Sequence, residues 1–453
     1  MSEKLLSAVV GGTVIDGNGG PPIERGVVLI EGRRIIAVDD RPNAKVPAAA
    51  IKIDATGKYV IPGLMDANVH LFLFPTTASD LVRYEGRYQD VIAEAAQISL
   101  KNGLTTVFDT WGPRHALTRV RDQIACGEET GSRIFFAGNI IGLGGPTSSD
   151  YWPVSRTILS KGEADIIDAR WEQGVGPDLL WMTPEQVRAR VRQYIEDGGQ
   201  NFIKYAGSGH THMQFLCFSE KVQRAIVEEG HRAAMVVQSH TTSAESLRVA
   251  LEVGCDLLQH PDVTGAMEMP DETLNAIARS GVPCATLFVT RDFLAWNELH
   301  GVEPMKSFHR VKDHNDSRLI EVGANLLLTS DSGVLPADAA DNPLLAPFAV
   351  ADDPPFSMGE AHFHWLKAAG QLGLSPMKIL MAATRNIARA YKVEKDLGTL
   401  EKGKFADLLI LDRNPLESTD NYRSIRYVMK EGAIVDRNSL PRTKLLTVRP
   451  AIC

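Results

Sequence analysis

Six polar residues of this chain stand at or near the ends of apolar segments, where their side chains could hold a metal ion. They are Asn68, His70, Lys204, His240, His260 and Asp331. Asn68 and His70 are two positions apart in VIPGLMDANVH, a spacing that points both side chains to one side of a strand. Two imidazoles in these places could bind one ion, but the first place holds an amide. Because buried charges must be paired or bound to a metal, the set as a whole indicates a metal site.

Eight short apolar segments alternate with helical patterns between residue 61 and about residue 390. They are VIPGLMDANVH, LTTVFDT, RIFFAG, FIKYAG, AMVVQSH, CDLLQH, VPCATLF and NLLLTSD. The helical pattern TPEQVRARVRQYIEDGG begins at Thr183 and has Gln186 three residues on, which is the spacing of a capping box. Eight strands alternating with helices predict an α/β fold, a distorted (β/α)8 TIM barrel. The six polar residues would then meet at the barrel mouth, where such barrels carry their active sites.

Both ends of the chain read as β structure. Residues 1–60 and 391–453 contain β-branched runs broken by Gly, Asp and Asn, such as RGVVLIEGRRIIAVDD and GKFADLLILD. These two parts predict one small β-sandwich that flanks the barrel of residues 61–390. A long segment follows the third barrel strand and carries Tyr151, Trp152 and Trp171. Its length and its exit from the active face predict a lid or binding loop.

The composition is that of a soluble globular protein, with 44% hydrophobic and 23% charged residues among 453. The formal net charge of −8 argues against a basic face for nucleic acid. The five cysteines are scattered without a CxxC pair, which suggests neither a disulfide framework nor a zinc knuckle. The first residues lack a long apolar run, so we expect no signal peptide, no membrane span and a cytoplasmic location.

These motifs, taken in order, resemble the amidohydrolase superfamily over nearly the whole chain. PGLMDANVH resembles the His-X-His motif of the first strand, and FIKYAG resembles the strand whose lysine is often carboxylated to bridge two metals. QSH and LQH resemble the two later histidine strands, and LLLTSD the last-strand aspartate. SPMKILMAATRNIARAYKVEKDLGTLEKGKFADLLILDRNPL is similar to the family's C-terminal signature. The resemblance implies the barrel and β-sandwich expected above.

Asn68 departs from the family pattern, and this departure bears on the number of metal ions. An amide oxygen is a poorer ligand than imidazole for zinc-like ions, so the position served by the first strand and Asp331 is weakened. The resemblance leaves a second position intact, with His240, His260 and a carboxylated Lys204 as ligands. We expect one divalent ion per chain, with zinc first and cobalt, manganese or iron as alternatives. The Asn-X-His motif also resembles a branch with phenylurea hydrolases and molinate hydrolase, which cleave urea or thiocarbamate herbicides.

The resemblance implies hydrolysis of a C–N or thiocarbamate bond at a urea, carbamate or amide carbonyl. A single divalent ion can lower the pKa of bound water from about 15.7 to about 7 and can polarise the carbonyl. We expect Asp331 to take a proton from that water and pass it to the leaving nitrogen, with a role as third ligand as the alternative. Asn68 and His70 would either hydrogen-bond to water or substrate or bind the metal weakly.

Five further residues are expected to bind the substrate: His210, His212, Tyr205, Trp152 and Arg291. His210 and His212 lie in GSGHTHM, directly after the lysine strand. They could stabilise the tetrahedral oxyanion, although a plain pair of loop histidines fits the sequence equally well.

Two other functions stay open at this stage. Hydrolysis of Xaa-Pro or other carboxyl-terminal dipeptides, or of N-acyl amino acids, would need a cation for the substrate carboxylate, and Arg156 or Arg291 could supply it. A metal-free assembly scaffold is the other alternative, but retention of the strand-end polar residues argues against it. The expected partners are a small-molecule substrate and, because the family often oligomerises, further copies of the chain.

Overall fold

Each of the eight apolar segments contains a strand of a parallel array. The strands are β6 (Leu64–Val69), β7 (Leu104–Asp109), β8 (Arg133–Phe136), β9 (Ile140–Ile141), β10 (Ile203–Ala206), β11 (Val237–His240), β12 (Leu257–Gln259), β13 (Pro283–Thr286) and β14 (Asn325–Leu328). The short strand β9 is a ninth strand that lies just beyond the third segment, and the hydrogen-bonded strands form two sheets, β6-β7-β8 and β14-β13-β12-β11-β10-β9. All of these strand pairs are parallel, which confirms the predicted alternation.

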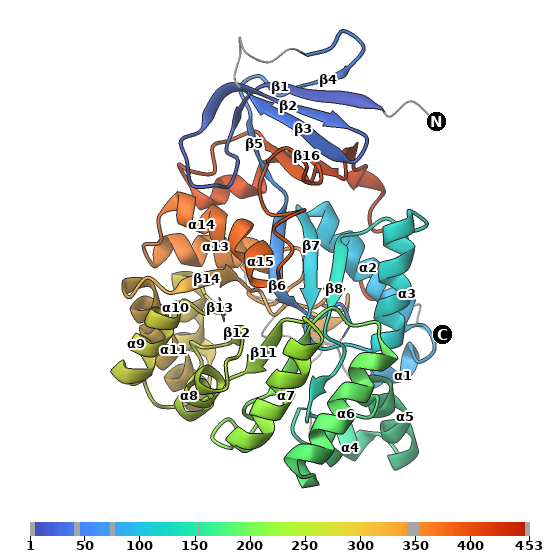
Figure 1. Cartoon of the computed structure of the whole chain (residues 1–453), viewed down its shortest axis with the longest axis vertical. Helices are drawn as coiled ribbons and strands as arrows, with labels where there is room; N and C mark the ends of the chain where they lie inside the picture. Colours follow the sequence, from blue (N-terminus) through green and yellow to red (C-terminus); the bar gives the residue numbers. More distant parts are fainter. Residues whose placement is uncertain are drawn as a thin grey trace.

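The computed structural model describes residues 5–39, 46–72, 78–151, 155–341, 349 and 353–448. Its helices are α1 (Ala78–Arg83), α2 (Tyr88–Lys101), α3 (Arg114–Cys126), α4 (Ser155–Ile158), α5 (Lys161–Glu172), α6 (Pro184–Asp197), α7 (Glu220–Arg232), α8 (Ala244–Glu252), α9 (Asp271–Ser280), α10 (Arg291–His300), α11 (Glu303–Glu321), α13 (Ala361–Gln371), α14 (Pro376–Ala382) and α15 (Arg385–Ala390). Short 3₁₀ turns occupy Pro177–Trp181, Ala339–Asp341, Thr419–Arg423 and Arg437–Ser439. Figure 1 shows the helices arranged around the parallel strands.

Helix α6 begins as its sequence predicts. The Thr183 hydroxyl accepts a hydrogen bond from the backbone N–H of Gln186, and the Gln186 side chain accepts one from the backbone N–H of Thr183 at 2.9 Å. This reciprocal pair satisfies two amide groups that have no partner within a helix. The capping-box prediction is therefore confirmed.

A second sheet draws its strands from both ends of the chain. Its members are β1 (Leu6–Val14), β2 (Ile23–Glu31), β3 (Arg34–Asp39), β4 (Ile51–Asp54), β5 (Tyr59–Pro62), β15 (Leu408–Leu411), β16 (Ile425–Lys430) and β17 (Ala433–Ile434). Strand β5 joins the two groups, because it pairs with β1 on one side and with β15 on the other. Val9, Val28 and Leu408 share one buried cluster, so both ends contribute to one core. Figure 1 shows this terminal sheet at one end of the molecule. The boundaries at residues 60 and 390 stay predictions.

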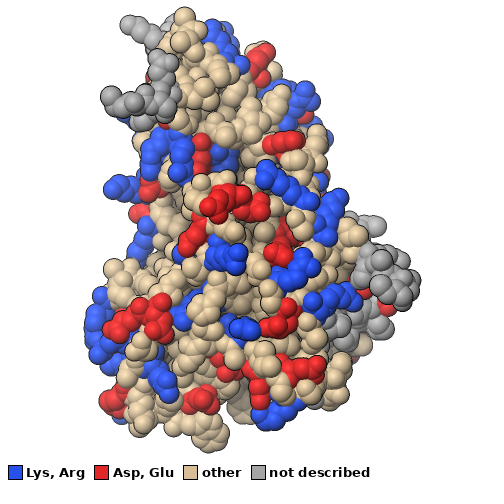
Figure 2. Space-filling model, turned by 90° about the vertical axis from the view of Figure 1, so that its right-hand side faces the viewer, with Lys and Arg blue, Asp and Glu red and all other residues tan. Residues whose placement is uncertain are grey.

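The surface carries charges of both signs. On the face shown in Figure 2, Lys and Arg side chains are interspersed with Asp and Glu side chains. Within the described residues, no helix combines the length and apolar character needed to cross a bilayer.

Backbone hydrogen bonds join the first barrel strand to the segment that follows the last. The N–H of Asp331 donates to the carbonyl of Asn68 at 2.9 Å, and the N–H of His70 donates to the carbonyl of Ser332 at 2.8 Å. Val69 and Ser332 form a parallel bridge at the same place. The two ends of the parallel array therefore meet at the residues that the sequence marks for chemistry.

A buried carboxyl group supports this junction from below. Asp66 on β6 is fully buried, and its Oδ1 accepts hydrogen bonds from the backbone N–H groups of Ser330 at 3.1 Å and Asn68 at 3.2 Å. Burial raises the pKa of Asp66 to about 7, against the lowering effect of the hydrogen bonds from Ser330 and Asn68.

The raised pKa of Asp66 predicts that the contribution of this side chain to the stability of the fold depends on pH. A carboxyl group whose pKa is higher in the folded than in the unfolded chain stabilises the fold fully below about pH 4, and that contribution is lost as the pH rises to about 7. Asp66→Asn does not titrate, so the stability of this variant relative to the native chain should rise by roughly 4 kcal/mol over that interval. Urea unfolding across this pH range measures the difference, with Asp122→Asn on the exposed face of α3 as control. A difference that stays constant with pH would contradict the prediction.

Candidate active site

Two buried histidines face each other at the ends of neighbouring strands. His240 is the last residue of β11, His260 follows β12, and their ring centroids are 5.1 Å apart. Their exposed fractions are only 3% and 5%. Among the described residues, neither nitrogen of His240 has a hydrogen-bond partner, and neither does Nδ1 of His260. Buried polar atoms are normally satisfied, so these nitrogens fit a metal ion as their partner.

Burial also keeps both imidazoles neutral. It lowers the pKa of His260 to about 4, and it holds the pKa of His240 well below its ordinary value, with repulsion from His210 adding to the effect. An imidazole binds a metal through its lone pair and therefore only in the neutral form. Both side chains are in that form at neutral pH.

Lys204 supplies the third group of this centre. It lies on β10 with 1% of its surface exposed, and its Nζ donates to the Thr110 hydroxyl at 3.0 Å. Burial lowers the pKa of Lys204 to about 8, although the charges of Asp331 and Asp109 act in the opposite direction. At neutral pH a lysine of this kind has an appreciable unprotonated fraction, which is the form that can add carbon dioxide to become a carbamate.

The donor set fits one divalent ion if the lysine takes part. No three His, Cys, Asp or Glu side chains in the described part of the chain are arranged to hold a metal. His240 and His260 provide two neutral imidazoles, and carboxylated Lys204 would provide a third donor, which is anionic. Lysine is not among the four residue types of that comparison. The unpartnered histidine nitrogens are the observation that favours this site.

Asp331 and His70 form the next pair. The Nε2 atom of His70 and the Oδ1 atom of Asp331 are 3.0 Å apart, and 24% of the Asp331 side chain is exposed. Burial raises the pKa of Asp331, but electrostatic interactions with His260, His70 and Lys204 and the hydrogen bond from His70 outweigh it and hold the pKa below its usual range. Asp331 is therefore ionised at neutral pH and can accept a proton.

Two of these residues have a backbone conformation that is unusual for any residue but glycine. The φ angle is 59° at His260 and 51° at Asp331. Backbone hydrogen bonds hold both: the His260 N–H donates to Ala285, and the Asp331 N–H donates to Asn68, each at 2.9 Å. Such conformations persist only where surrounding structure fixes them, and they are common at functional sites. The positive φ angle at His260 interrupts the alternation of side chains between the two sides of the strand. Gln259 and His260 therefore both face the interior.

Both polar atoms of the Asn68 side chain already have protein partners. Its Oδ1 accepts a hydrogen bond from the Thr110 hydroxyl, and its Nδ2 donates to Oε1 of Gln259 at 3.1 Å. The side chain is fully buried. Asn68 therefore belongs to the polar network of the barrel interior rather than to the histidine pair.

The sequence patterns do not single out Thr110 or Gln259. A signal for both is nevertheless present, since Thr110 closes the segment LTTVFDT and Gln259 precedes His260 in a segment that is otherwise apolar. A polar side chain that is fully buried in such a segment needs a partner, and each of these has one in Asn68.

His210 reaches the histidine pair, together with two aromatic residues. Its ring centroid is 4.3 Å from that of His240, 5.4 Å from Trp111 and 5.5 Å from Tyr151. Its Nδ1 lies 3.5 Å from Oδ2 of Asp150, and 20% of its side chain is exposed. Tyr151 and Asp150 come from the long segment after the third strand, so this segment contacts His210.

The structure also shows the surroundings of three other residues that the sequence predicts to bind substrate. Tyr205 is fully buried beside Ser239 and Cys255, because neighbouring residues of a strand point to opposite sides and Lys204 takes the inner one. Arg291 is exposed at the start of α10 and pairs with Asp313 at 3.0 Å. His212 is exposed and contacts Phe215. Trp152 lies outside the described residues.

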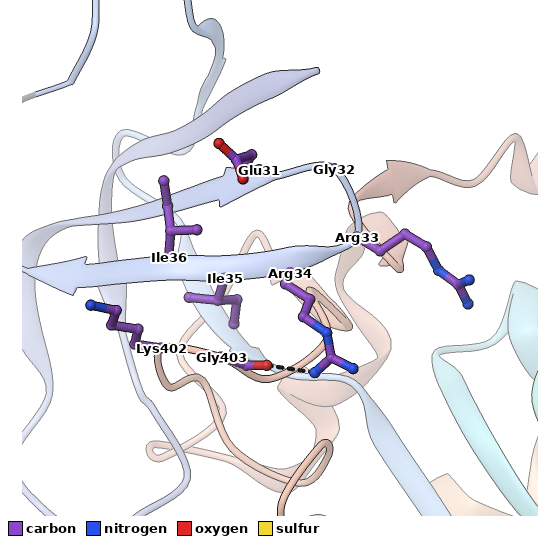
Figure 3. A pocket seen from close by; sticks show the side chains of 8 residues that line it. All are labelled: Glu31, Gly32, Arg33, Arg34, Ile35, Ile36, Lys402 and Gly403. Atoms are coloured by element: carbon purple, nitrogen blue, oxygen red, sulfur yellow. Dashed lines mark hydrogen bonds between the residues drawn. The ribbon is translucent and has the colours of Figure 1, made fainter. Parts of the chain in front are cut away.

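A cavity of about 540 Å³ lies in the terminal sheet and is lined largely by the β2–β3 hairpin (Figure 3). Arg34 donates to the carbonyl of Gly403 and pairs with Asp396 at 2.7 Å, and Arg33 pairs with Glu431. None of the strand-end residues lines this cavity. Because its arginines are already paired with acids, we place the chemistry at the barrel mouth.

Comparison with known proteins agrees with this geometry. The model of the amidohydrolase family matches residues 59–435. The solved structure of molinate hydrolase is 36% identical with a TM-score of 0.92, covering 99% of this chain and 98% of that chain. Phenylurea hydrolase B is 35% identical with a TM-score of 0.91, covering 98% and 100%. Ochratoxinase from Aspergillus niger is 24% identical over 456 residues, which cover 95% of this chain and 87% of ochratoxinase.

These matches confirm the predicted fold class and the predicted branch. The fold of these relatives is a (β/α)8 barrel with a β-sandwich, and the family generally uses a divalent metal ion. The chain therefore belongs to the amidohydrolase family and is a hydrolase that acts on carbon–nitrogen bonds.

Proposed function

We propose that the chain is a hydrolase with one divalent metal ion that cleaves urea, carbamate, thiocarbamate or amide substrates, with phenylureas as the first class to test. One observation carries the proposal: among the described residues, both ring nitrogens of His240 and Nδ1 of His260 lack protein partners, whereas the Asn68 amide has two. The histidine pair can therefore bind one ion, whereas Asn68 has no polar atom left for a second. The likeness to molinate hydrolase and phenylurea hydrolase B supports the substrate class.

The proposed metal ligands are His240, His260 and carboxylated Lys204. A divalent ion bound there would polarise the substrate carbonyl and make a water molecule more acidic. Zinc is the first candidate, with cobalt, manganese and iron as alternatives.

Asp331 performs the proton transfers in this proposal. Its ionised carboxylate takes one proton from the attacking water as the new C–O bond forms at the carbonyl carbon. It then gives that proton to the leaving nitrogen as the C–N bond breaks, or to sulfur in a thiocarbamate. The hydrogen bond from His70 Nε2, at 3.0 Å, fixes the orientation of the carboxylate. His210, which adjoins His240, is placed to donate a hydrogen bond to the carbonyl oxygen as negative charge develops there.

The aromatic residues favour an aryl or N-alkyl group beside the carbonyl. Trp111 and Tyr151 pack edge to face with centroids 4.6 Å apart, and both adjoin His210. Apolar walls of this kind suit a small organic substrate. We also expect a homo-oligomer and a cytoplasmic location, as the sequence predicts.

The dipeptidase alternative has less support. It needs a cation for the substrate carboxylate, and Arg291 is paired with Asp313 at the surface. The side chain of Arg156 lies outside the described residues. The scaffold alternative leaves the buried histidine nitrogens without a purpose.

If both histidines bind the metal, replacing either one should have the same effect. His240→Ala and His260→Ala should each remove most of the bound metal and the activity, because each deletes one of few strong ligands. Metal per chain, measured by elemental analysis of protein purified without chelator, provides the test. His231→Ala is the matched control, since His231 is an exposed histidine that pairs with Asp256. Two tightly bound ions per native chain would overturn the single-metal proposal.

Asp331→Asn separates proton transfer from metal binding. The variant should keep its metal and lose turnover by about 100-fold or more, which is the usual contribution of a general acid–base group. Asp256→Asn, at a partly exposed acid that also pairs with a histidine, is the control. Loss of metal together with activity would make Asp331 a ligand instead.

A substrate panel tests the substrate class directly. Phenylureas, thiocarbamates and N-acyl amino acids should be compared by kcat/KM with the metal-loaded enzyme. We expect phenylureas or thiocarbamates to give the highest values. A preference for N-acyl amino acids or Xaa-Pro dipeptides would favour the dipeptidase alternative.

A further inference from the structure

A continuous chain of hydrogen bonds crosses the barrel interior beneath the active site. Its members, in order of donation, are Lys204, Thr110, Asn68, Gln259, Gln238, Tyr391 and the backbone carbonyl of Ala67. We call this chain the amide relay. Its side chains come from β10, from the end of β7, from β6, β12 and β11, and from the residue that follows α15.

The two ends of the relay fix its direction. Lys204 Nζ can only donate, either as an ammonium group or as the N–H of a carbamate, and a backbone carbonyl can only accept. Between these ends, Gln238 Nε2 donates to the Tyr391 hydroxyl at 3.3 Å, and that hydroxyl donates to Ala67 at 2.7 Å. Each intermediate side chain must therefore accept from one neighbour and donate to the next. The Asn68 amide has one allowed orientation, with its oxygen toward Thr110 and its nitrogen toward Gln259.

The relay is also closed to water. Thr110, Asn68, Gln238 and Gln259 are all fully buried. In such surroundings each broken link leaves a polar group unsatisfied, which costs much more than in water. The relay therefore holds Asn68 more firmly than a single hydrogen bond would.

We propose that Gln259 and Thr110 are positioning residues that limit the active site to one metal ion, because they occupy both faces of the side chain at position 68. This inference rests on the single-metal function proposed above. It differs from the view that an amide has simply replaced an imidazole ligand. In the relay, the neighbours of position 68 withhold that side chain from a metal whichever residue stands there.

The argument applies to an imidazole introduced at position 68. A neutral imidazole has one N–H donor and one acceptor nitrogen. In the relay, the acceptor would be taken by the Thr110 hydroxyl and the N–H would donate to Gln259, so no lone pair would be available for a metal. Removing either neighbour would release one nitrogen. His70 and Asp331 could then serve beside it as further donors.

Metal content distinguishes the two views. Asn68→His alone should still bind one Co²⁺ or Zn²⁺ ion per chain, and its kcat should fall because the relay is disturbed. The double variants Asn68→His/Gln259→Leu and Asn68→His/Thr110→Val should each bind a second ion, seen by elemental analysis and by a second step in a Co²⁺ titration followed by absorbance. The two double variants open the relay from opposite sides, so if one fails to fold, the other decides.

A matched control excludes a general effect of losing a buried glutamine. Gln223 is fully buried on α7 and donates to the backbone carbonyl of Phe218 at 2.9 Å, outside the relay. Asn68→His/Gln223→Leu should therefore remain at one ion per chain.

Three results would be decisive against one or other proposal. A second tightly bound ion in Asn68→His alone would overturn the relay as the limit and leave the single-metal function of the native chain intact. Folded double variants that remain at one ion would overturn it as well. Two ions in the native chain would overturn the proposed single-metal function itself.

Discussion

The polar centre depends on how the first strand of the barrel meets the segment after the last. The Asp331 N–H donates to the carbonyl of Asn68, and this bond sets the register in which β6 and that segment lie side by side. Because side chains alternate along a strand, a shift of one residue would turn Asn68 and His70 away from the interior. The same bond brings the Asp331 carboxylate to the His70 ring. Both the proton-transfer pair and the relay therefore follow from one junction.

Exclusion of water then gives similar side chains different chemical states. Burial lowers the pKa values of His260 and Lys204, to about 4 and about 8, and raises that of Asp66 to about 7. Asp331 stays ionised because its electrostatic interactions with His260, His70 and Lys204 lower its pKa, whereas among the described residues no base is hydrogen-bonded to Asp66. The site thus contains neutral bases that can bind a metal and one charged acid that can accept a proton.

The sequence predicts the parts of this arrangement that depend on local pattern. The eight strands, the cap of α6 and the strand-end positions of His240 and His260 all follow from the periodicity of apolar residues and from the motifs. The relay depends on contacts across the barrel: Tyr391 and Ala67 are 324 positions apart, and no local pattern records that they meet. Tyr205 and Lys204 are neighbours in the sequence but face opposite sides of the strand, a distinction that the motif alone does not record.

The direction of the relay also bears on the state of Lys204. If the lysine becomes a carbamate, its nitrogen loses the ammonium charge but keeps one N–H group. That group can still donate to the Thr110 hydroxyl, so the orientation of the Asn68 amide is the same with either form of the lysine. The relay therefore imposes no choice between the free and the carboxylated amine. Its effect is confined to position 68, where it keeps the side chain bound to the protein while the histidine pair remains open to a metal.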